Sequence, residues 1–337
     1  MKKILFVALA ATLLAAGCQK TEIINRVGDR IGFASEMGKL TKAASEEGLA
    51  TLKTQSFYVW AYCAYTDVIN GVEPGEVHEE MEYLTVSHND TKGWHTEEDY
   101  YWPGKNKDLD FFAVSSKSVA KTQVEPVGGT VAEGARTLTI TEYVVDNATA
   151  TDDLMVADFV RQNQDENEKV VNLTFRHTLS KVQFLFMTSE NADKEVIVKS
   201  VTVSDVVTKG NLAVSETADA RFTWTPSTVE GDAKEFTKTE DLTLTKDAKD
   251  YATWLVLPQG IVEDPDAETL TGLTVEVVYT MGGKEFTSSF PLYKSDLKKW
   301  APNQYIKYTV LLTPNVIKFN PTVEDWTDPS TEVDMVN

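Results

Sequence analysis

Imidazole and carboxylate side chains gather between residues 88 and 99, where they could bind a metal ion. His88 and His95 stand seven positions apart, with Lys92 and Gly93 between them. Three carboxylates follow: Glu97, Glu98 and Asp99. These are zinc ligand types, but their spacing fits neither one face of a helix nor a compact metal-binding loop. Gly93 and Lys92 are typical of a surface turn. We therefore expect a solvated turn here, and no metal or other cofactor.

Catalytic motifs are also missing from the sequence. It contains no glycine-rich phosphate loop, no CxxC, no HExxH and no G-x-S-x-G. Neighbouring carboxylates occur in turn-rich segments, at Asp152–Asp153 and at Glu263–Asp264 with Asp266. Such pairs are more often solvated than arranged for acid–base chemistry. We expect a protein that is not an enzyme.

Cys18 is the residue whose surroundings most clearly indicate covalent chemistry. Lys2 and Lys3 precede an apolar run, Ile4–Ala16, which is too short to span a bilayer and ends in Ala15-Ala16-Gly17-Cys18. This pattern predicts a signal peptide over residues 1–17 of the lipoprotein type, with the thiol of Cys18 acylated. Ala15 stands where leucine is usual, so an ordinary secretory signal with an incidental cysteine is the alternative.

Composition narrows the classes of partner. The chain has 52 acidic and 32 basic residues and a net charge of −20. Phosphate backbones and anionic membrane surfaces would be repelled, so we expect no nucleic-acid partner. If Cys18 carries lipid, Cys63 has no disulfide partner within the chain. Cys63 stands in an apolar strand pattern, and we expect it to be a small buried side chain.

The rest of the chain is predicted to form strands separated by turns. Phe57–Tyr65 is aromatic and apolar on both faces, Tyr305–Leu312 is the clearest strand pattern, and Gly282-Gly283 sits in a hairpin over 273–290. No amphipathic helix of ordinary length is expected. We predict an all-β chain of two antiparallel β-sandwich domains in series. The first would cover 51–168 and the second 169–337, after a tether with a first strand over 18–50.

An aromatic cluster allows two interpretations. Tyr100-Tyr101-Trp102 precedes Pro103-Gly104, and further rings lie at Trp60, Tyr62 and Trp94. These rings could form a platform on which sugars stack. We favour the alternative, in which they pack at the edge of the sandwich and contribute buried area to its core.

Several stretches together resemble a known family. They are Tyr100–Pro103 with Leu109–Ala113, Phe175–Val182, Trp300–Val310 and Val323–Trp326, in that order along the chain. These stretches and the Cys18 motif are similar to those of the fimbrillin-like family, lipoprotein precursors of type V pilus subunits in Gram-negative anaerobes. The resemblance implies two transthyretin-like sandwiches, transit to the outer membrane as a lipoprotein, and polymerisation by strand exchange on the cell surface.

The resemblance also implies how such subunits assemble. A protease removes the lipidated tether and first strand, here Arg30–Ser35, and a strand of another subunit fills the groove. The cut would fall at Lys42-Ala43, although the family usually has arginine there. The donor strand would lie near the C-terminus, where Val323, Trp326, Val333 and Met335 are candidate plugs.

Two functions remain open at this point. The first is a structural subunit (stalk, tip or anchor) of a fimbria, with other fimbrial subunits as partners and a host or bacterial surface receptor as a further candidate. The second is a surface lipoprotein that binds glycans through its aromatic clusters without polymerising. The alternative for the proposed donor stretch near the C-terminus is that it is simply the last strand of its own domain.

Overall fold

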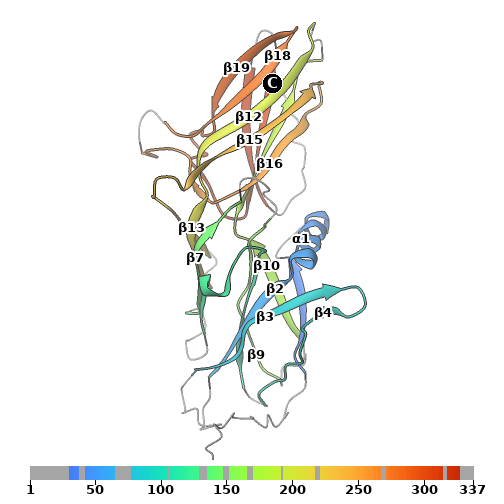
Figure 1. The fold of residues 1–337 in the computed structure, drawn as a ribbon, viewed down its shortest axis with the longest axis vertical. Helices are drawn as coiled ribbons and strands as arrows, with labels where there is room; N and C mark the ends of the chain where they lie inside the picture. The colour runs from blue at the N-terminus through green and yellow to red at the C-terminus, as the bar shows by residue number, and fades with distance from the viewer. Residues whose placement is uncertain are drawn as a thin grey trace, which may run out of the picture.

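The chain folds into an elongated molecule with a lower and an upper half (Figure 1). The computed structural model describes residues 30–37, 42–64, 77–104, 107–128, 135–146, 152–164, 170–190, 193–216, 221–266, 271–313 and 317–326. Strands make up most of this part of the chain, so the all-β prediction is confirmed.

An eight-stranded sheet forms most of the lower half. Its order is β1 (Gly32–Met37), β10 (Val170–His177), β8 (Met155–Ala157), β5 (Leu109–Ser115), β2 (Phe57–Ala64), β3 (Val77–Asn89) and β4 (Gly93–His95), with β9 (Val160–Gln162) also on β5. A second sheet has the order β14 (Phe222–Pro226), β13 (Lys209–Ser215), β7 (Thr137–Val144) and β6 (Val124–Val127), and the short 3₁₀ helix η1 (Lys121–Gln123) precedes β6.

The eight-stranded sheet is apolar on both faces, as β2 shows. Trp60 packs in the same buried cluster as Leu138 of the second sheet, whereas Phe57 and Val59 belong to a separate cluster on the opposite face. Side chains of a strand alternate between faces, so the aromatic and apolar run of β2 serves both clusters. The expectation that this strand is apolar on both faces is confirmed, and Cys63 is buried in the second cluster.

The second cluster is enclosed because the eight-stranded sheet curls. Its two end strands, β1 and β4, are in contact. The backbone N–H of Ile31 donates a hydrogen bond of 2.8 Å to the carbonyl oxygen of Tyr100, and Arg30 forms a bridge with Tyr101. Residues 30–37 thus close the sheet around the second cluster.

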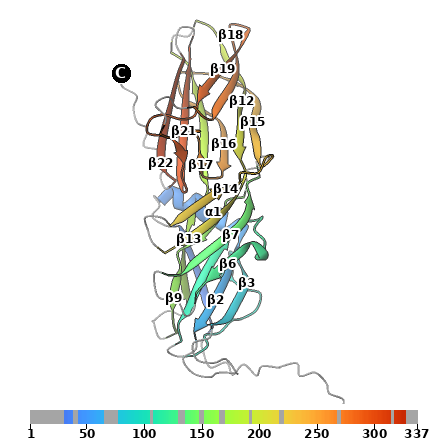
Figure 2. The ribbon, with the colours of Figure 1, turned by 90° about the vertical axis from the view of Figure 1, so that its left-hand side faces the viewer.

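Two four-stranded sheets form the upper half (Figure 2). The first has the order β16 (Lys249–Val256), β11 (Ser180–Met187), β21 (Gln304–Leu312) and β22 (Ile317–Asp325). The second has the order β15 (Ala233–Thr243), β12 (Val196–Val207), β18 (Thr274–Met281) and β19 (Lys284–Pro291). The short pair β17 (Gln259–Gly260) and β20 (Lys299–Trp300) completes the described strands.

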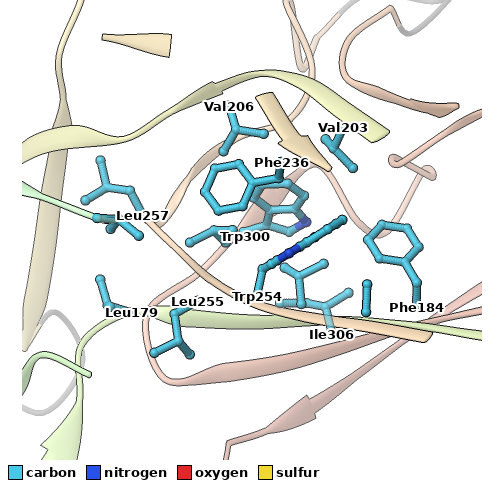
Figure 3. Close-up of a cluster of buried hydrophobic side chains, with 14 of the residues drawn as sticks. Leu179, Phe184, Val203, Val206, Phe236, Trp254, Leu255, Leu257, Trp300 and Ile306 are labelled. Atoms are coloured by element: carbon cyan, nitrogen blue, oxygen red, sulfur yellow. The ribbon is translucent and has the colours of Figure 1, made fainter. Parts of the chain in front are cut away.

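The upper core lies between these sheets. Phe236 and Val203 come from one sheet and Trp254 and Ile306 from the other, and Trp300 lies among them (Figure 3). This core belongs to the same buried cluster as the inter-sheet core of the lower half. The two halves are therefore packed as a continuous apolar interior.

Two features that were predicted from short stretches of sequence, a hairpin and a strand, are confirmed. β18 and β19 pair across Gly282-Gly283, whose φ angles of +56° and +78° are those that glycine adopts without strain. The strand predicted over Tyr305–Leu312 is also confirmed, and β21 buries every second residue from Ile306 to Leu312.

Two expectations are wrong. The sheets are not purely antiparallel, because β1 pairs with β10 in parallel and β11 pairs with β21 in parallel. Each parallel pair joins segments far apart in the chain, which leaves room for the long connection that parallel strands need. A helix of ordinary length also exists, α1 (Lys42–Gln55). Its alanine, glutamate, lysine and leucine residues favour helix, and Leu52 docks on the core without a long apolar stripe.

Backbone pairing crosses the expected domain limits. α1 spans the limit at residue 50, and β10, which begins just after residue 168, pairs with β1 and β8 of the lower half. β13 pairs with β7 across the same limit. The division at 168 stays a prediction, as does the transthyretin-like assignment of the two sandwiches. Within the described residues, no helix has the length and apolarity needed to cross a membrane.

Candidate strand-exchange site at the edge strand β1

β1 lies at the end of its sheet and is hydrogen-bonded to β10 alone among the described strands. Its register runs from Gly32 opposite Val170 to Met37 opposite Phe175. Parallel pairing is slightly weaker per residue than antiparallel pairing. β1 is thus a short edge strand held by one neighbour, close to the first strand expected over Arg30–Ser35.

Every second residue of this segment points into the second cluster. Ile31, Phe33 and Met37 are buried, with 3%, 8% and 7% of their surface exposed. The ring of Phe33 packs edge-on against Phe57 and Phe111, with ring centroids 6.5 and 6.3 Å apart. Although β1 is an edge strand, it supplies part of the core of the lower half.

Polar contacts add little to what holds β1 in place. The hydroxyl of Thr174 donates a 2.9 Å hydrogen bond to the carboxylate of Glu36 at the surface. Arg30 pairs with Asp99 at 2.8 Å, but both side chains are about half exposed, and such pairs contribute at most about 1 kcal/mol. The hydroxyl oxygen of Ser35 is buried with no hydrogen-bond partner. Apolar burial and the backbone ladder therefore dominate the attachment of β1.

The candidate cleavage bond Lys42–Ala43 lies at the start of α1, since Lys42 is the first residue of the helix. The other end of α1 is anchored: Gln55 donates to the carbonyl oxygen of Asp153 at 3.0 Å and accepts from its N–H at 3.1 Å. A cut at this bond would separate β1 from α1 while leaving the anchored end of the helix in place.

The other predicted site residues fall in different places. Cys18, Val333 and Met335 lie outside the described residues. Val323 lies in β22 opposite Ile306 and is 42% exposed. Trp326 directly follows β22 and is buried, and its backbone N–H donates to the carbonyl oxygen of Asn303 at 2.8 Å. β22 is therefore paired with β21 of the same chain, as the last described strand of its sheet.

The sequence positions of the four candidate plugs place them on different faces of an extended segment. Positions two apart share a face of a strand, whereas positions three apart face opposite sides. Val333 and Met335 would share a face in an extended segment, but Val323 and Trp326 would not. The four residues thus do not form one continuous apolar face.

The aromatic cluster is largely core. Trp60 and Trp102 are 2% and 1% exposed. Trp102 packs against Phe111, and the partly buried Trp94 packs against Phe57 with ring centroids 4.9 Å apart. The interpretation of these rings as packing residues is the one that the structure supports.

The histidine segment forms a surface hairpin. β3 and β4 pair around Asn89 and Gly93, and the side-chain oxygen of Asn89 accepts hydrogen bonds from the N–H groups of Thr91 and Lys92. His95 contacts Asn89 and the carbonyl of Gly93. Among the described residues, no group of three or more histidine, cysteine, aspartate or glutamate side chains could hold a metal ion.

A buried network of charged side chains in the lower half was not predicted from the sequence. Asp110, 1% exposed, accepts hydrogen bonds from Arg136 at 2.9 Å and from Arg161 at 2.8 Å. Arg136, 4% exposed, also pairs with Glu216. The charged residue at 110 interrupts an apolar strand, and that interruption is the signal that could have revealed a buried ion pair.

Comparison with models of known protein families identifies the family of the chain. The family model described as fimbrillin-like matches residues 41–326. The chain belongs to the fimbrillin-like family. The matched residues include α1 and β22 but begin after β1, so the edge strand lies outside the match.

Solved structures show the same fold. A fimbrial protein from Bacteroides vulgatus ATCC 8482 is similar with a TM-score of 0.58 and 17% identity, over 88% of this chain and 99% of that one. A proposed cell adhesion protein from Bacteroides ovatus ATCC 8483 is similar with a TM-score of 0.51 and 13% identity, over 90% of this chain and 99% of that one. Among curated proteins, none matches the chain.

Proposed function

We propose that this fimbrillin-like chain is a structural subunit of a cell-surface fimbria, exported as a lipoprotein acylated at Cys18 and assembled by replacement of β1. The observation that carries the proposal is the position of β1. It is an edge strand that precedes Lys42, pairs with β10 alone among the described strands, and still fills the core with Phe33 and Met37. Family membership and the likeness to a fimbrial protein support a role at the cell surface.

Removal of β1 would create an acceptor site. The edge of β10 would present unpaired N–H and C=O groups, and the spaces left by Ile31, Phe33 and Met37 would expose apolar surface. An extended segment of another chain can satisfy both needs at once, through ladder hydrogen bonds and alternate apolar side chains. Other fimbrial subunits are therefore the partners, and the lipid on Cys18 holds the precursor at the outer membrane before processing.

Cleavage between Lys42 and Ala43 would start the exchange. Residues 38–41 lie outside the described part, and the bond sits at the first residue of α1. The first turn of a helix has free N–H groups and frays more readily than its interior. We propose that a protease accepting lysine opens the chain there.

The test is to treat the purified chain with a lysine-specific protease and image the product by electron microscopy. We expect filaments from the natural chain and none from the double variant Lys39→Gln with Lys42→Gln, because a cut after Lys39 would also release β1. Lys53→Gln, a lysine within the same helix, is the matched control that still assembles. Cleaved chains that stay monomeric would refute assembly by strand exchange. If those monomers bound glycans, the surface lipoprotein would replace the fimbrial subunit as the function.

A further inference from the structure

A cavity of about 290 Å³ lies at one end of the upper half and belongs to no site described above. It is lined by residues that follow β11, residues that lead into β12, and residues that follow β15. β12 begins and β15 ends at the end of the upper half that lies away from the lower half (Figure 1). This apex cavity is therefore remote from β1, which lies in the lower half.

Backbone hydrogen bonds hold the lining segments of the apex cavity together. The N–H of Thr188 donates to the carbonyl oxygen of Thr245 at 2.8 Å, and the N–H of Leu244 donates to that of Val196 at 2.9 Å. The hydroxyl of Thr188 donates to the carbonyl oxygen of Leu312 at 2.7 Å. Val196 and Leu244 are buried in the core of the upper half. Because the lining is anchored to the core, the cavity is preformed, as small-molecule sites usually are.

The turn between β18 and β19 supports one wall of the cavity. The N–H of Gly282 donates to the carbonyl oxygen of Glu195 at 3.0 Å. A Cβ atom at Gly282 would lie 2.9 Å from Cδ of Lys194, so the missing side chain leaves room for the stem of that lysine. Lys194 and Glu195, both of which line the cavity, are thus positioned by the hairpin.

Four charged side chains line the cavity, and their charges cancel: Glu190, Lys194, Glu195 and Lys246. Nζ of Lys246 lies 3.1 Å from a carboxylate oxygen of Glu190, with the side chains 58% and 72% exposed. An ion pair this exposed contributes little stability, so a ligand can separate it at small cost. Within the described residues, the charged groups of Lys194 and Glu195 have no hydrogen-bond or ion-pair partner. Donors and acceptors are therefore both available to a ligand.

This lining favours one class of ligand. An anion would be repelled by two carboxylates, and a cation by two ammonium groups. An apolar ligand would gain little, because the lining residues Val196 and Leu244 are already buried. A hydroxyl group both donates and accepts, so neighbouring hydroxyls can donate to a carboxylate and accept from an ammonium group. A neutral molecule with several hydroxyl groups matches the lining.

We propose that the apex cavity binds one neutral pyranose ring of a glycan. Two adjacent hydroxyls of the ring bind the carboxylate of Glu195 and the ammonium group of Lys194, and others bind Glu190 and Lys246. Hydrogen bonds to charged groups are stronger than those between neutral groups, which favours hydroxyls at these positions. A volume of about 290 Å³ is at the lower end of the range for ligand sites, so it suits a single ring.

This binding activity goes beyond assembly and does not require the removal of β1. It also differs from the sugar platform considered at Tyr100–Trp102, where the rings are largely core. No aromatic residue lines the apex cavity. Recognition there depends on charged side chains and hydroxyl groups instead of ring stacking.

Saturation-transfer NMR on the uncut chain from Gln19 to Asn337 tests the ligand class. The probes are the methyl glycosides of glucose, galactose, mannose, fucose, xylose, N-acetylglucosamine and N-acetylgalactosamine. We expect at least one of them to bind, and to bind more tightly than the corresponding uronic acid or 2-amino sugar. The inference is overturned if no glycoside in this panel binds, or if the charged sugars bind equally well.

Amide chemical shifts of the isotope-labelled chain locate the bound sugar. We expect the shift changes to include the N–H groups of Thr188, Val196 and Thr245. Changes confined to Tyr101 and the indole of Trp94 would place the sugar on the aromatic cluster and would overturn the assignment to the apex.

Substitutions test the two unpaired charged groups. We expect Glu195→Gln and Lys194→Gln each to weaken binding about tenfold, the scale of one charge-assisted hydrogen bond. Glu285→Gln and Lys284→Gln are the matched controls, because these exposed residues of β19 follow the same turn but do not line the cavity. All four positions are exposed, so urea denaturation should show unchanged stability. If Glu195→Gln binds as tightly as Glu285→Gln, the proposed contact is wrong.

These results are separable from those on assembly. β1 stays in place in the uncut chain, so a failure of sugar binding counts against the apex cavity alone. A cut chain that forms no filaments counts against strand exchange alone.

Discussion

The indole ring of Trp326 lies parallel to the imidazole ring of His177, with ring centroids 3.8 Å apart and planes within 10° of each other. His177 ends β10, the neighbour of β1, and its Nδ1 lies 2.7 Å from a carboxylate oxygen of Asp153. Asp153 is in turn held by Gln55 of α1. The end of β22 is thus joined through side chains to the strand and helix that flank β1.

Trp326 should stabilise this joint. We expect Trp326→Ala to lower the free energy of unfolding by about 3 kcal/mol, because it empties a site that a large buried ring fills. Val323→Ala, three residues earlier and 42% exposed, should cost less than about 1 kcal/mol. Urea denaturation measures both values, and equal losses would show that the stack contributes nothing particular.

We expect the buried hydroxyl of Ser35 to destabilise the packing of β1. Ser35→Ala should raise the free energy of unfolding by about 1 kcal/mol, because it removes a buried oxygen without a partner. Ser115→Ala is the matched control, since that hydroxyl donates to Ser56 at 2.6 Å, and its loss should destabilise the chain. A loss of stability in both variants, measured by urea denaturation, would contradict this reading of Ser35.

Cys63 reports on the β1 site. The thiol is buried in the second cluster together with Phe33, and burial, followed by the charge of Glu80, raises its pKa to about 12. The reactive thiolate is therefore scarce at pH 8. In a Cys18→Ser chain, we expect iodoacetamide to modify Cys63 negligibly before cleavage and faster once β1 is displaced, with the denatured chain setting the maximum rate. Rapid modification of the intact chain would mean that the cluster is open.

We expect the buried network at Asp110 to stabilise the fold. Asp110→Asn leaves the guanidinium groups of Arg136 and Arg161 without the carboxylate that they share, and should cost about 3 kcal/mol. Asp99→Asn breaks the half-exposed pair with Arg30 and should cost less than about 1 kcal/mol. Chemical denaturation compares the two, and a small effect at Asp110 would show that the buried arginines find other partners.

The sequence predicted those features that depend on neighbouring residues. The strand pattern over Tyr305–Leu312 and the glycine pair at 282–283 predicted β21 and the β18–β19 hairpin, because strand propensity and φ preference act within a few residues. The Cys18 motif is equally local, and its acylation stays a prediction.

Only the tertiary structure decided which segments meet. β1 pairs in parallel with β10, Phe33 packs against Phe57 and Phe111, and α1 forms and buries Leu52 and Gln55. Pairing between strands distant in the chain depends on which apolar faces fit together, and the local sequence pattern does not determine this.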